Sequence, residues 1–526
     1  MSGVTLVIIA ATLVGLALRL YQLTRPGYLL GVTEYDDGTD FGSAVRLAQG
    51  FLPYRDFIIV QPPGIVLLMS PVALLTKGIG VTRGMAVARV VTALAGAASV
   101  PLAGLLVRHR GVLAATVACG IAAVYPASVQ SAHTVLLEPW LVRFCLAGAV
   151  AVFDGDRLTS STGRLAWGGA AFGFAGAVKV WAVLPVVVIL VLAAGPAAGR
   201  PRRVTSYLAG VVAGFALPVL PFAIAAPRTF YHSVIVAQLI RVDDVRAPLA
   251  FRLREMTGLT DVPSFGLAAL LVISVALIAA VTACCVLASR VTRRPPPPLE
   301  WFALASTVLI IVAFLWPDDF YYHYAGFLAP FLALAIAVPV SRLVTAAGPW
   351  PGPLARRWAG VRGLASVRTP ATPAAAVAGI AILLMAIAQL DAETGLKASP
   401  SPADVAAARR IIPPGACVLA DQVSYAIAAD RFISSVPGCS LMVDSIGTDY
   451  SLSGGQNAAT GAGRSPAVRA AWLAALRPAR YVWLSGLAAK RVPLRAPPVA
   501  AYFKRHFRLV PGGPPGLYIR TGLPPR

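Results

Sequence analysis

The side chains of this chain that are best suited to chemistry lie in one short segment, residues 33–64. The segment holds five of the chain's 22 acidic residues: Glu34, Asp36, Asp37, Asp40 and Asp56. A carboxylate beside lipid is costly unless it is solvated, paired or functional, and a positioned carboxylate can act as a general base. We therefore interpret the segment as the catalytic face of a membrane enzyme. A solvated loop or a helix N-terminal cap is the alternative interpretation.

The segment belongs to a very apolar chain. Hydrophobic residues make up 57% of the 526 residues and charged residues only 13%, whereas soluble domains are roughly 25% charged. Mean hydropathy is +0.74. The apolar residues form runs of about 20, the length that crosses a bilayer. The sequence therefore predicts an α-helical polytopic membrane protein. Its first run, 4–21, lacks a basic n-region and is expected to stay as a signal anchor.

The apolar runs predict eleven membrane spans. They are expected near residues 4–22, 88–107, 111–128, 135–153, 165–178, 180–197, 204–226, 264–289, 301–316, 324–345 and 371–390. One further apolar run, 58–76, contains Pro62, Pro63 and Pro71. These prolines suit a broken helix that lies at, or partly enters, the outer interface without crossing the membrane.

Positive charge sets the predicted orientation. The net charge is +23, and basic residues cluster between apolar runs, at 108–110, 157–164, 200–203, 290–294 and 342–368. Cytoplasmic loops collect Lys and Arg, so the N-terminus is predicted to be cytoplasmic and the C-terminus to lie outside the plasma membrane. If 58–76 crossed the membrane, these loops would face the wrong side. Nucleic-acid binding is not expected, because no basic patch is interleaved with aromatic residues on a soluble domain.

The tail, residues 391–526, is predicted to be a separate soluble α/β domain on the outer side. Short apolar strands are expected at 416–421, 479–484 and 516–521, and helices between them at 403–411, 466–476 and 498–505. Strands that alternate with helices suit a small layered α/β domain. Cys417 and Cys439 could pair in an oxidising compartment or remain free thiols, and the sequence leaves both open.

The first loop resembles the corresponding loop of the GT-C glycosyltransferase superfamily, in the branch that includes protein O-mannosyltransferases and lipid A aminoarabinose transferases. The resemblance rests on an acidic pair (Asp36–Asp37), an aromatic residue (Phe41), a P-Y-R-D-F element (53–57) and a helix that opens with QPPG (61–64). The usual pair is Asp-Glu, so the Asp-Asp pair leaves open which carboxylate has which role. Over the rest of residues 1–390 the resemblance is one of topology, which implies a GT-C-like transmembrane catalytic domain.

The resemblance implies an inverting glycosyltransferase that moves a sugar from a polyprenyl-phosphate donor to an acceptor at the outer membrane face. Such a reaction needs a general base for the acceptor hydroxyl and cations for the departing lipid phosphate. Asp36 matches the first acidic position and is assigned as the base, and Asp37 would orient it or contact the sugar. A composition rich in Ala, Gly, Pro and Arg but poor in Lys is typical of a high-GC bacterium, which favours a cell-envelope glycan, lipid or protein as acceptor.

Two residues outside the first loop match weaker motifs of these relatives. Glu138, in LLEPW, resembles a second acidic position that binds a metal or the acceptor; pairing with Arg143 is the alternative. Lys179 follows a glycine-rich span and would clamp the lipid phosphate; a lysine that snorkels to the interface is the alternative. A divalent metal is therefore left open, and no other cofactor is implied.

Three more residues are candidate substrate contacts. His323 lies in an aromatic stretch and could contact phosphate or sugar, or simply belong to an interfacial aromatic belt. Arg55 could reach the phosphate or pair with Asp56. Gln61 stands where some relatives have His or Lys before the PP pair.

Two other functions remain alternatives. A polytopic lipid or sugar transporter or flippase would be expected to show internal repeats and ionisable residues near the middle of the membrane, and the sequence shows neither. An inactive scaffold that retains the fold and binds lipid is the other, and the retention of Asp36 and Lys179 argues against it.

Overall fold

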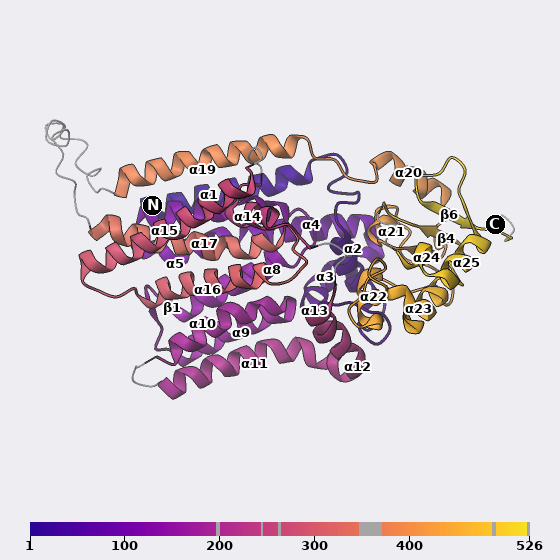
Figure 1. Ribbon diagram of the computed structural model, residues 1–526, viewed down its shortest axis with the longest axis horizontal. Coiled ribbons are helices and arrows are strands. Elements are labelled where there is room, and N and C mark those ends of the chain that lie inside the picture. The colour runs from indigo at the N-terminus through magenta and orange to yellow at the C-terminus, as the bar shows by residue number, and fades with distance from the viewer. Residues whose placement is uncertain (196–199, 243–245, 261–264, 347–370, 487–490, 523–526) are drawn as a thin grey trace.

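The structure is a computed structural model that describes residues 1–195, 200–242, 246–260, 265–346, 371–486 and 491–522. Figure 1 shows a long helical bundle with a C-terminal α/β region packed on one of its ends. The N-terminus lies at the other end of the bundle. Between the bundle and the α/β region lies a layer of short helices formed by the first loop and by residues near 230.

The predicted apolar runs all coincide with one helix or with two consecutive helices. The bundle consists of α1 (Gly3–Leu23), α4 (Val81–Ala97), α5 (Ser99–Val107), α6 (Val112–Val124), α8 (Glu138–Val152), α9 (Thr162–Val178), α10 (Val183–Ala193), α11 (Arg200–Ala225), α15 (Leu267–Thr292), α16 (Pro298–Leu315), α17 (Tyr324–Ala346) and α19 (Ala371–Thr394). Seven helices of the described chain are long and apolar enough to cross a membrane. The polytopic helical class is thus confirmed, and the count of eleven spans stays a prediction.

The short helices lie at the end of the bundle that meets the α/β region (Figure 1). They are α2 (Tyr35–Ala48), α3 (Gly64–Ile79), α12 (Pro227–Phe230), η3 (Tyr231–Val236), α13 (Ala237–Ile240) and α14 (Leu249–Thr257). The helix α3 covers most of the run predicted to lie at the interface, with Pro71 inside it, and packs against α2 and α4. It is too short to be among the seven long apolar helices. Its depth in the membrane stays a prediction.

Local sequence signals explain several helix ends. The helix α20 (Pro402–Ile411) begins with a capping box, in which Ser401 and Asp404 each bind the other's backbone N–H. The short helix α7 (Pro126–Gln130) has proline at its first position, where the missing N–H costs nothing. The helix α14 ends at Gly258, whose φ of 73° lies in the left-handed region.

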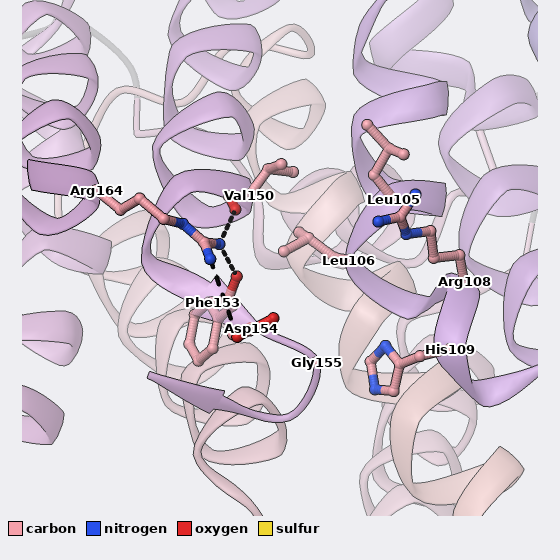
Figure 2. A pocket seen from close by; sticks show the side chains of 9 residues that line it. All are labelled: Leu105, Leu106, Arg108, His109, Val150, Phe153, Asp154, Gly155 and Arg164. Atoms are coloured by element: carbon pink, nitrogen blue, oxygen red, sulfur yellow. Dashed lines mark hydrogen bonds and ion pairs between the residues drawn. The ribbon is translucent and has the colours of Figure 1, made fainter. Parts of the chain in front are cut away.

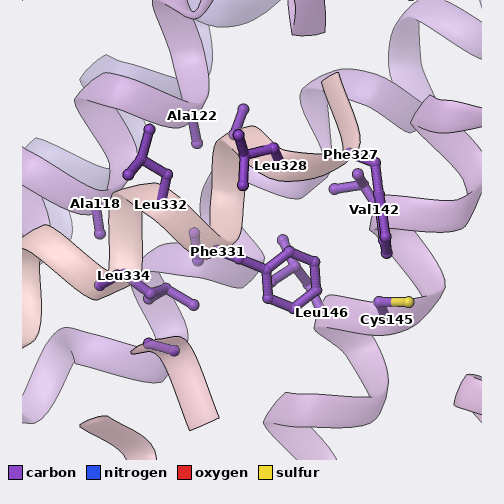
Figure 3. Packing of buried hydrophobic residues seen from close by; sticks show 14 of the residues in the cluster. Ala118, Ala122, Val142, Cys145, Leu146, Phe327, Leu328, Phe331, Leu332 and Leu334 are labelled. Atoms are coloured by element: carbon purple, nitrogen blue, oxygen red, sulfur yellow. The ribbon is translucent and has the colours of Figure 1, made fainter. Parts of the chain in front are cut away.

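The main apolar core lies inside the bundle and centres on α17. Of the apolar window of α17, 72% is buried, compared with 17% for α1 and 6% for α15. Figure 3 shows Phe327, Phe331 and Leu328 of this helix among side chains of α6 and α8. The helix α17 is therefore the axis of the bundle, and Tyr324, its first residue, is held at a defined place at the end near α2.

The C-terminal region contains a four-stranded mixed sheet. Its strands are β3 (Val418–Ala420), β4 (Tyr481–Trp483), β5 (Phe507–Leu509) and β6 (Leu517–Arg520), in the order β3-β4-β6-β5, with β3 parallel to β4 and the other pairs antiparallel. The predicted strands match β3, β4 and β6, and the predicted helices match α20, α23 (Pro466–Leu476) and α25 (Pro497–His506). The strand β5 was not predicted. Cys417 and Cys439 form a disulfide.

A second apolar core joins the C-terminal region to the first loop. It contains Phe41 and Ile65 from the loop helices together with Tyr425, Phe432 and Trp483 from the C-terminal region. Both parts therefore bury apolar surface against each other, and the first loop lies between the bundle and the tail. The boundary between residues 390 and 391 stays a prediction.

The basic clusters share the end of the bundle that lies away from the α/β region (Figure 1). They occupy η1 (Arg108–Arg110), a hairpin formed by β1 (Phe153–Asp154) and β2 (Arg157–Leu158), the start of α11 and the end of α15. The fifth cluster begins at Arg342, and its part from 347 to 368 lies outside the described residues. One end of the bundle is thus basic, as the predicted orientation requires, and the acidic segment lies at the other end.

Cysteine labelling tests this orientation. Residue 395 follows α19 on the way to the C-terminal region, whereas residue 297 precedes α16, whose Leu299 N–H donates to Asp156 at the basic end. We expect Gly395→Cys to react with an impermeant maleimide added to intact cells, and Pro297→Cys to react only after lysis. The background variant lacks the free Cys119, Cys145, Cys284 and Cys285. Labelling of both positions from the same side would refute the predicted topology.

Candidate active site

The acidic segment forms the start of α2. Glu34 is the residue before the helix, and Asp36 and Asp37 lie in its first turn, where the positive end of the helix dipole favours carboxylates. Asp36 and Asp40 are one turn apart and so share a face of the helix. Asp37 points elsewhere. The two members of the acidic pair therefore meet different surroundings.

Asp37 anchors the helix. Its side chain is fully buried, and Arg89 of α4, also fully buried, donates to its Oδ2 at 2.5 Å. Thr134 donates to the same oxygen at 2.6 Å, and Ser424 of the C-terminal region donates to Oδ1 at 3.0 Å. Both oxygens of this buried carboxylate therefore accept hydrogen bonds from the protein. Of the two roles predicted for Asp37, these contacts favour orienting Asp36 by holding α2 in place, and the contact with the sugar stays a prediction.

Asp36 is the free carboxylate of the pair. Its side chain keeps solvent-accessible surface, and no hydrogen bond joins it to another described residue. Protein nevertheless surrounds it, and this enclosure raises the pKa of the Asp36 carboxyl above its ordinary value. The charges of His323, Lys179 and Arg241 act in the opposite direction, and Glu138 adds to the rise. The charges of His323, Lys179 and Arg241 thus act on Asp36, although none of these side chains forms an ion pair with it in the described structure.

Glu138, Lys179 and His323 form one buried cluster. Lys179 Nζ lies 2.6 Å from Glu138 Oε1, and His323 Nδ1 lies 3.0 Å from the same oxygen. Lys179 Nζ also lies over two rings, 3.6 Å from the centroid of Trp181 and 4.5 Å from that of Tyr324. Lys179 is 5% exposed, so it is not a snorkelling lysine. Glu138 pairs with Lys179 and His323, and the predicted alternative partner Arg143 instead lies against the Trp140 ring.

Close packing brings the first loop to this cluster. A Cβ added to Gly64, the first residue of α3, would lie 2.5 Å from the carbonyl oxygen of Ala177, so a larger residue cannot fit there. Ala177 is two residues before Lys179, at the end of α9. The glycine of the QPPG motif therefore allows α3 to sit against the turn that presents Lys179.

A second ion pair borders the cluster. Arg241, which follows α13, pairs with Asp319, and its Nη2 donates to the Tyr324 hydroxyl at 2.9 Å. Tyr322 of the same stretch donates to Glu34 Oε1 at 2.7 Å. The acidic pair in WPDDFYYHY was visible in the sequence, but its partner on a distant segment was not. Three further arginines follow Arg241 in the chain: Arg246 pairs with Asp318 at the surface, Arg252 donates to the carbonyls of Phe314, Pro317 and Asp318, and Arg254 donates to the Phe265 carbonyl.

The structure places Arg55 and Gln61 apart from these contacts. Arg55 is half exposed and pairs with Asp56 through two hydrogen bonds of 2.8 and 3.0 Å. This is the scaffold alternative that the sequence left open. The carbonyl of Gln61 accepts the Tyr54 hydroxyl at 2.5 Å. No hydrogen bond or ion pair among the described residues joins either side chain to the cluster, so their contact with substrate stays a prediction.

The C-terminal region completes the surroundings of α2. Ser424 and Gln422 donate to the Glu34 carbonyl at 2.8 and 3.0 Å. A Cβ on Gly38 would lie 2.3 Å from Ser424 Oγ, so only glycine allows this approach. Asp444 accepts the Tyr35 hydroxyl at 2.9 Å, and burial raises the pKa of its carboxyl to about 6. Sequence reasoning missed Asp444, because nothing in the tail indicates that it packs on the first loop.

Asp40 also lies in this environment. It is buried, and its Oδ2 has no hydrogen-bond partner among the described residues. Burial raises the pKa of the Asp40 carboxyl well above its ordinary value, and Asp36 and Asp444 raise it further. The face of α2 that carries Asp36 therefore also carries a second carboxyl whose pKa is raised.

The residues present do not form a recognisable metal site. No group of three His, Cys, Asp or Glu side chains with the spacing of metal ligands occurs in the described part of the chain. Glu138, predicted to bind a metal or the acceptor, pairs with Lys179, and both predicted roles stay open.

Comparisons with known proteins concern the family and the fold of the chain. The family model for dolichyl-phosphate-mannose-protein mannosyltransferases matches residues 76–236. The crystal structure of ArnT from Cupriavidus metallidurans in the apo state is similar over 81% of this chain and 85% of ArnT, with 16% identity and a TM-score of 0.54. ArnT bound to undecaprenyl phosphate gives 17% identity, 82% and 85% coverage, and a TM-score of 0.55.

A second solved relative comes from an archaeon. The Archaeoglobus fulgidus oligosaccharyltransferase in complex with Zn and sulfate is similar over 96% of this chain and 72% of its own, with 14% identity and a TM-score of 0.55. A search of curated protein sequences finds no significant match. At these identities the likeness concerns the fold. The chain is thus a polytopic helical membrane protein, and it shares its fold with the solved ArnT and oligosaccharyltransferase structures, which confirms the GT-C-like fold predicted from its first loop.

The two aspartates of the pair should respond differently to the same substitution. Asp37→Asn removes the charge that balances the buried Arg89, and breaking a buried ion pair costs about 3–5 kcal/mol. We expect a large loss of thermal stability in detergent, measured by scanning fluorimetry. Asp36→Asn, at the exposed position next to it, serves as the matched control and should unfold close to the wild-type temperature. Equal stability of the two variants would contradict the anchoring role.

Proposed function

We propose that this protein is an inverting glycosyltransferase that moves a sugar from a polyprenyl-phosphate donor to a cell-envelope acceptor at the outer face of the plasma membrane. The observation that carries the proposal is the Asp36 carboxylate, exposed and without a hydrogen bond to another described residue, whose pKa the charges of His323, Lys179 and Arg241 act to lower. The fold and the family match support the enzyme class. The solved complex of ArnT with undecaprenyl phosphate supports the class of donor.

The proposed reaction is a single displacement with Asp36 as the base. Asp36 takes the proton of the acceptor hydroxyl while that oxygen forms a bond to the anomeric carbon of the sugar. The bond from that carbon to the phosphate oxygen breaks on the opposite side, and its electron pair leaves with the polyprenyl phosphate. The configuration therefore inverts, and no covalent enzyme intermediate is needed. The enclosure that raises the pKa of Asp36 makes it a better base than a free aspartate.

The cations opposite Asp36 would stabilise the departing phosphate. In the structure Lys179 forms an ion pair with Glu138, and Arg241 forms one with Asp319. These two pairs balance in charge, and a protonated His323 adds one positive charge to them. A phosphate oxygen that approached Lys179 and Arg241 would share them with the carboxylates. Cations held in fixed positions need no reorganisation when charge develops on the leaving group.

An apolar groove offers a path for the lipid tail. A cavity of about 430 Å³ lies between α14, α15, α16 and α17, and side chains such as Leu253, Leu277, Ile311 and Leu315 line it. Arg252, next to Leu253, donates to the carbonyls of Pro317 and Asp318, so the groove ends beside the stretch that carries Asp319. We place the polyprenyl tail in this groove, with its phosphate at Arg241 and Lys179. The transporter alternative gains no support from a cluster that lies at one end of the bundle.

Replacing the base should remove catalysis while binding persists. For Asp36→Asn we expect the transfer rate to fall on the order of 10²–10⁴-fold, the usual contribution of a general base, with donor affinity within a few fold of wild type. The assay incubates the purified protein with radiolabelled polyprenyl-phosphate sugars and envelope acceptors. Asp56→Asn removes a carboxylate from the same loop that pairs only locally, and it should stay active. Near wild-type turnover of Asp36→Asn would remove this assignment.

Loss of the lysine should act on the donor. We expect Lys179→Ala to weaken binding of the polyprenyl-phosphate sugar far more than binding of the acceptor. Because Lys179→Ala alone leaves Glu138 buried with less compensation, the paired variant Lys179→Ala with Glu138→Gln separates the two effects. If the double variant regains wild-type donor affinity, Lys179 serves only to neutralise Glu138, and the phosphate site moves to Arg241.

A further inference from the structure

A second cavity lies at the basic end of the bundle, far from α2. It measures about 590 Å³ and opens between the ends of α5 and α8, the β1–β2 hairpin and the start of α9. Leu105, Leu106, Val150 and Phe153 form its apolar wall. Figure 2 shows that Arg108 and Arg164 approach it from opposite sides, with the hairpin below. The cavity is within the size range of sites for small ligands.

Both arginines have donors to spare. The Arg108 side chain is exposed and forms no hydrogen bond or ion pair with another described residue. Arg164 donates from Nε to the Ala151 carbonyl at 3.0 Å and from Nη2 to the carbonyls of Phe153 and Val150 at 2.6 and 3.5 Å. Its Nη1 lies 4.0 Å from Asp154 Oδ2, too far for a hydrogen bond. An oxyanion in the cavity could therefore be bound from two sides.

Local acidic residues leave the cavity positive. Asp156 is occupied by Arg110, at 2.7 Å, and by His109, at 2.8 Å. Asp154 lies at the rim, and its side chain is 79% exposed. Arg108 and Arg164 thus face a single, well-hydrated carboxylate. This balance suits a ligand that brings its own negative charge.

The cavity also lies at the level of a membrane surface. Trp167 of α9, one turn after Arg164, is 78% exposed, and Trp301 of α16 is 51% exposed. Tryptophan is enriched at the boundary between lipid and water. Leu299, two residues before Trp301, donates its backbone N–H to the backbone carbonyl of Asp156, beside the cavity, at 3.1 Å. Leu105 of the apolar wall is also 40% exposed, so the cavity opens close to this surface.

We propose that this cavity binds the headgroup of an anionic phospholipid, with its phosphate between Arg108 and Arg164 and the start of its acyl chains against Leu105, Leu106 and Phe153. Basic pockets between membrane helices on the cytoplasmic side recognise such headgroups, and this end of the bundle is the one predicted to face the cytoplasm. This lipid site is separate from the proposed active site, and the lipid proposal does not depend on the proposed reaction.

Lipid binding by the intact protein tests the proposal. The full chain is titrated with phosphatidylglycerol or with phosphatidylcholine of the same acyl chains, and bound lipid is counted by native mass spectrometry. We expect wild type to prefer phosphatidylglycerol and Arg108→Gln to bind it about fivefold more weakly, since one surface arginine contributes about that much. Arg157→Gln is the matched control. It removes an exposed arginine of the β1–β2 hairpin that does not line the cavity, and this variant should bind the lipid as wild type does.

The remaining measurements decide between the possible ligands. Arg164→Gln should weaken phosphatidylglycerol binding further. Because Arg164 also holds the end of α8, this variant is used only if it elutes as a folded protein; otherwise the result for Arg108→Gln decides alone. Unchanged binding by Arg108→Gln, or an equal loss in Arg157→Gln, would overturn the site. Complete displacement of the lipid by inorganic phosphate would overturn the lipid assignment and indicate a site for soluble anions.

Discussion

The buried ion pair between Asp37 and Arg89 is the interaction on which the end of the bundle next to the C-terminal region depends. Arg89 also donates to the carbonyls of Tyr28, Leu29 and Gly31, so one side chain ties the end of the first span, the start of α2 and α4 together. A buried arginine without its carboxylate would be very costly. The pair therefore fixes where α2 begins, and with it the direction in which Asp36 points.

The C-terminal region closes this arrangement from the other side. Ser424 donates both to Asp37 and to the carbonyl of Glu34, and Gly38 leaves the space for it. Asp444 and Asp40 surround Asp36 with carboxyl groups whose pKa values are raised. A tail that would otherwise be an appendage is thus part of the wall around the proposed base. The shared apolar core supplies most of the attachment, since burial of apolar surface is the dominant favourable term.

The two ends of the bundle have opposite chemistry. At the end near the tail, carboxylates and cations are buried and paired in a small volume around Glu138 and Asp319. At the far end, arginines are exposed and only partly neutralised, around a cavity with an apolar wall. Enclosure makes charges interact strongly at the first end. Solvent and headgroups screen them at the second, which suits reversible attraction of anionic lipid.

The helices of this protein could be predicted from the sequence, because apolar runs and periodic patterns are local properties. The runs, the helices of the tail, three of its four strands and the GT-C resemblance of the first loop all follow from neighbouring residues. The short β5 carries too weak a local signal. Only the tertiary structure decided which carboxylate of the Asp36–Asp37 pair is buried in an ion pair and which is left without a partner among the described residues. Two adjacent carboxylates are chemically identical in the sequence, and they differ only because α2 turns one toward Arg89 and Ser424 and the other toward open space. The same holds for Arg241 and Asp444, since residues far apart in the chain meet only when packing brings their helices together.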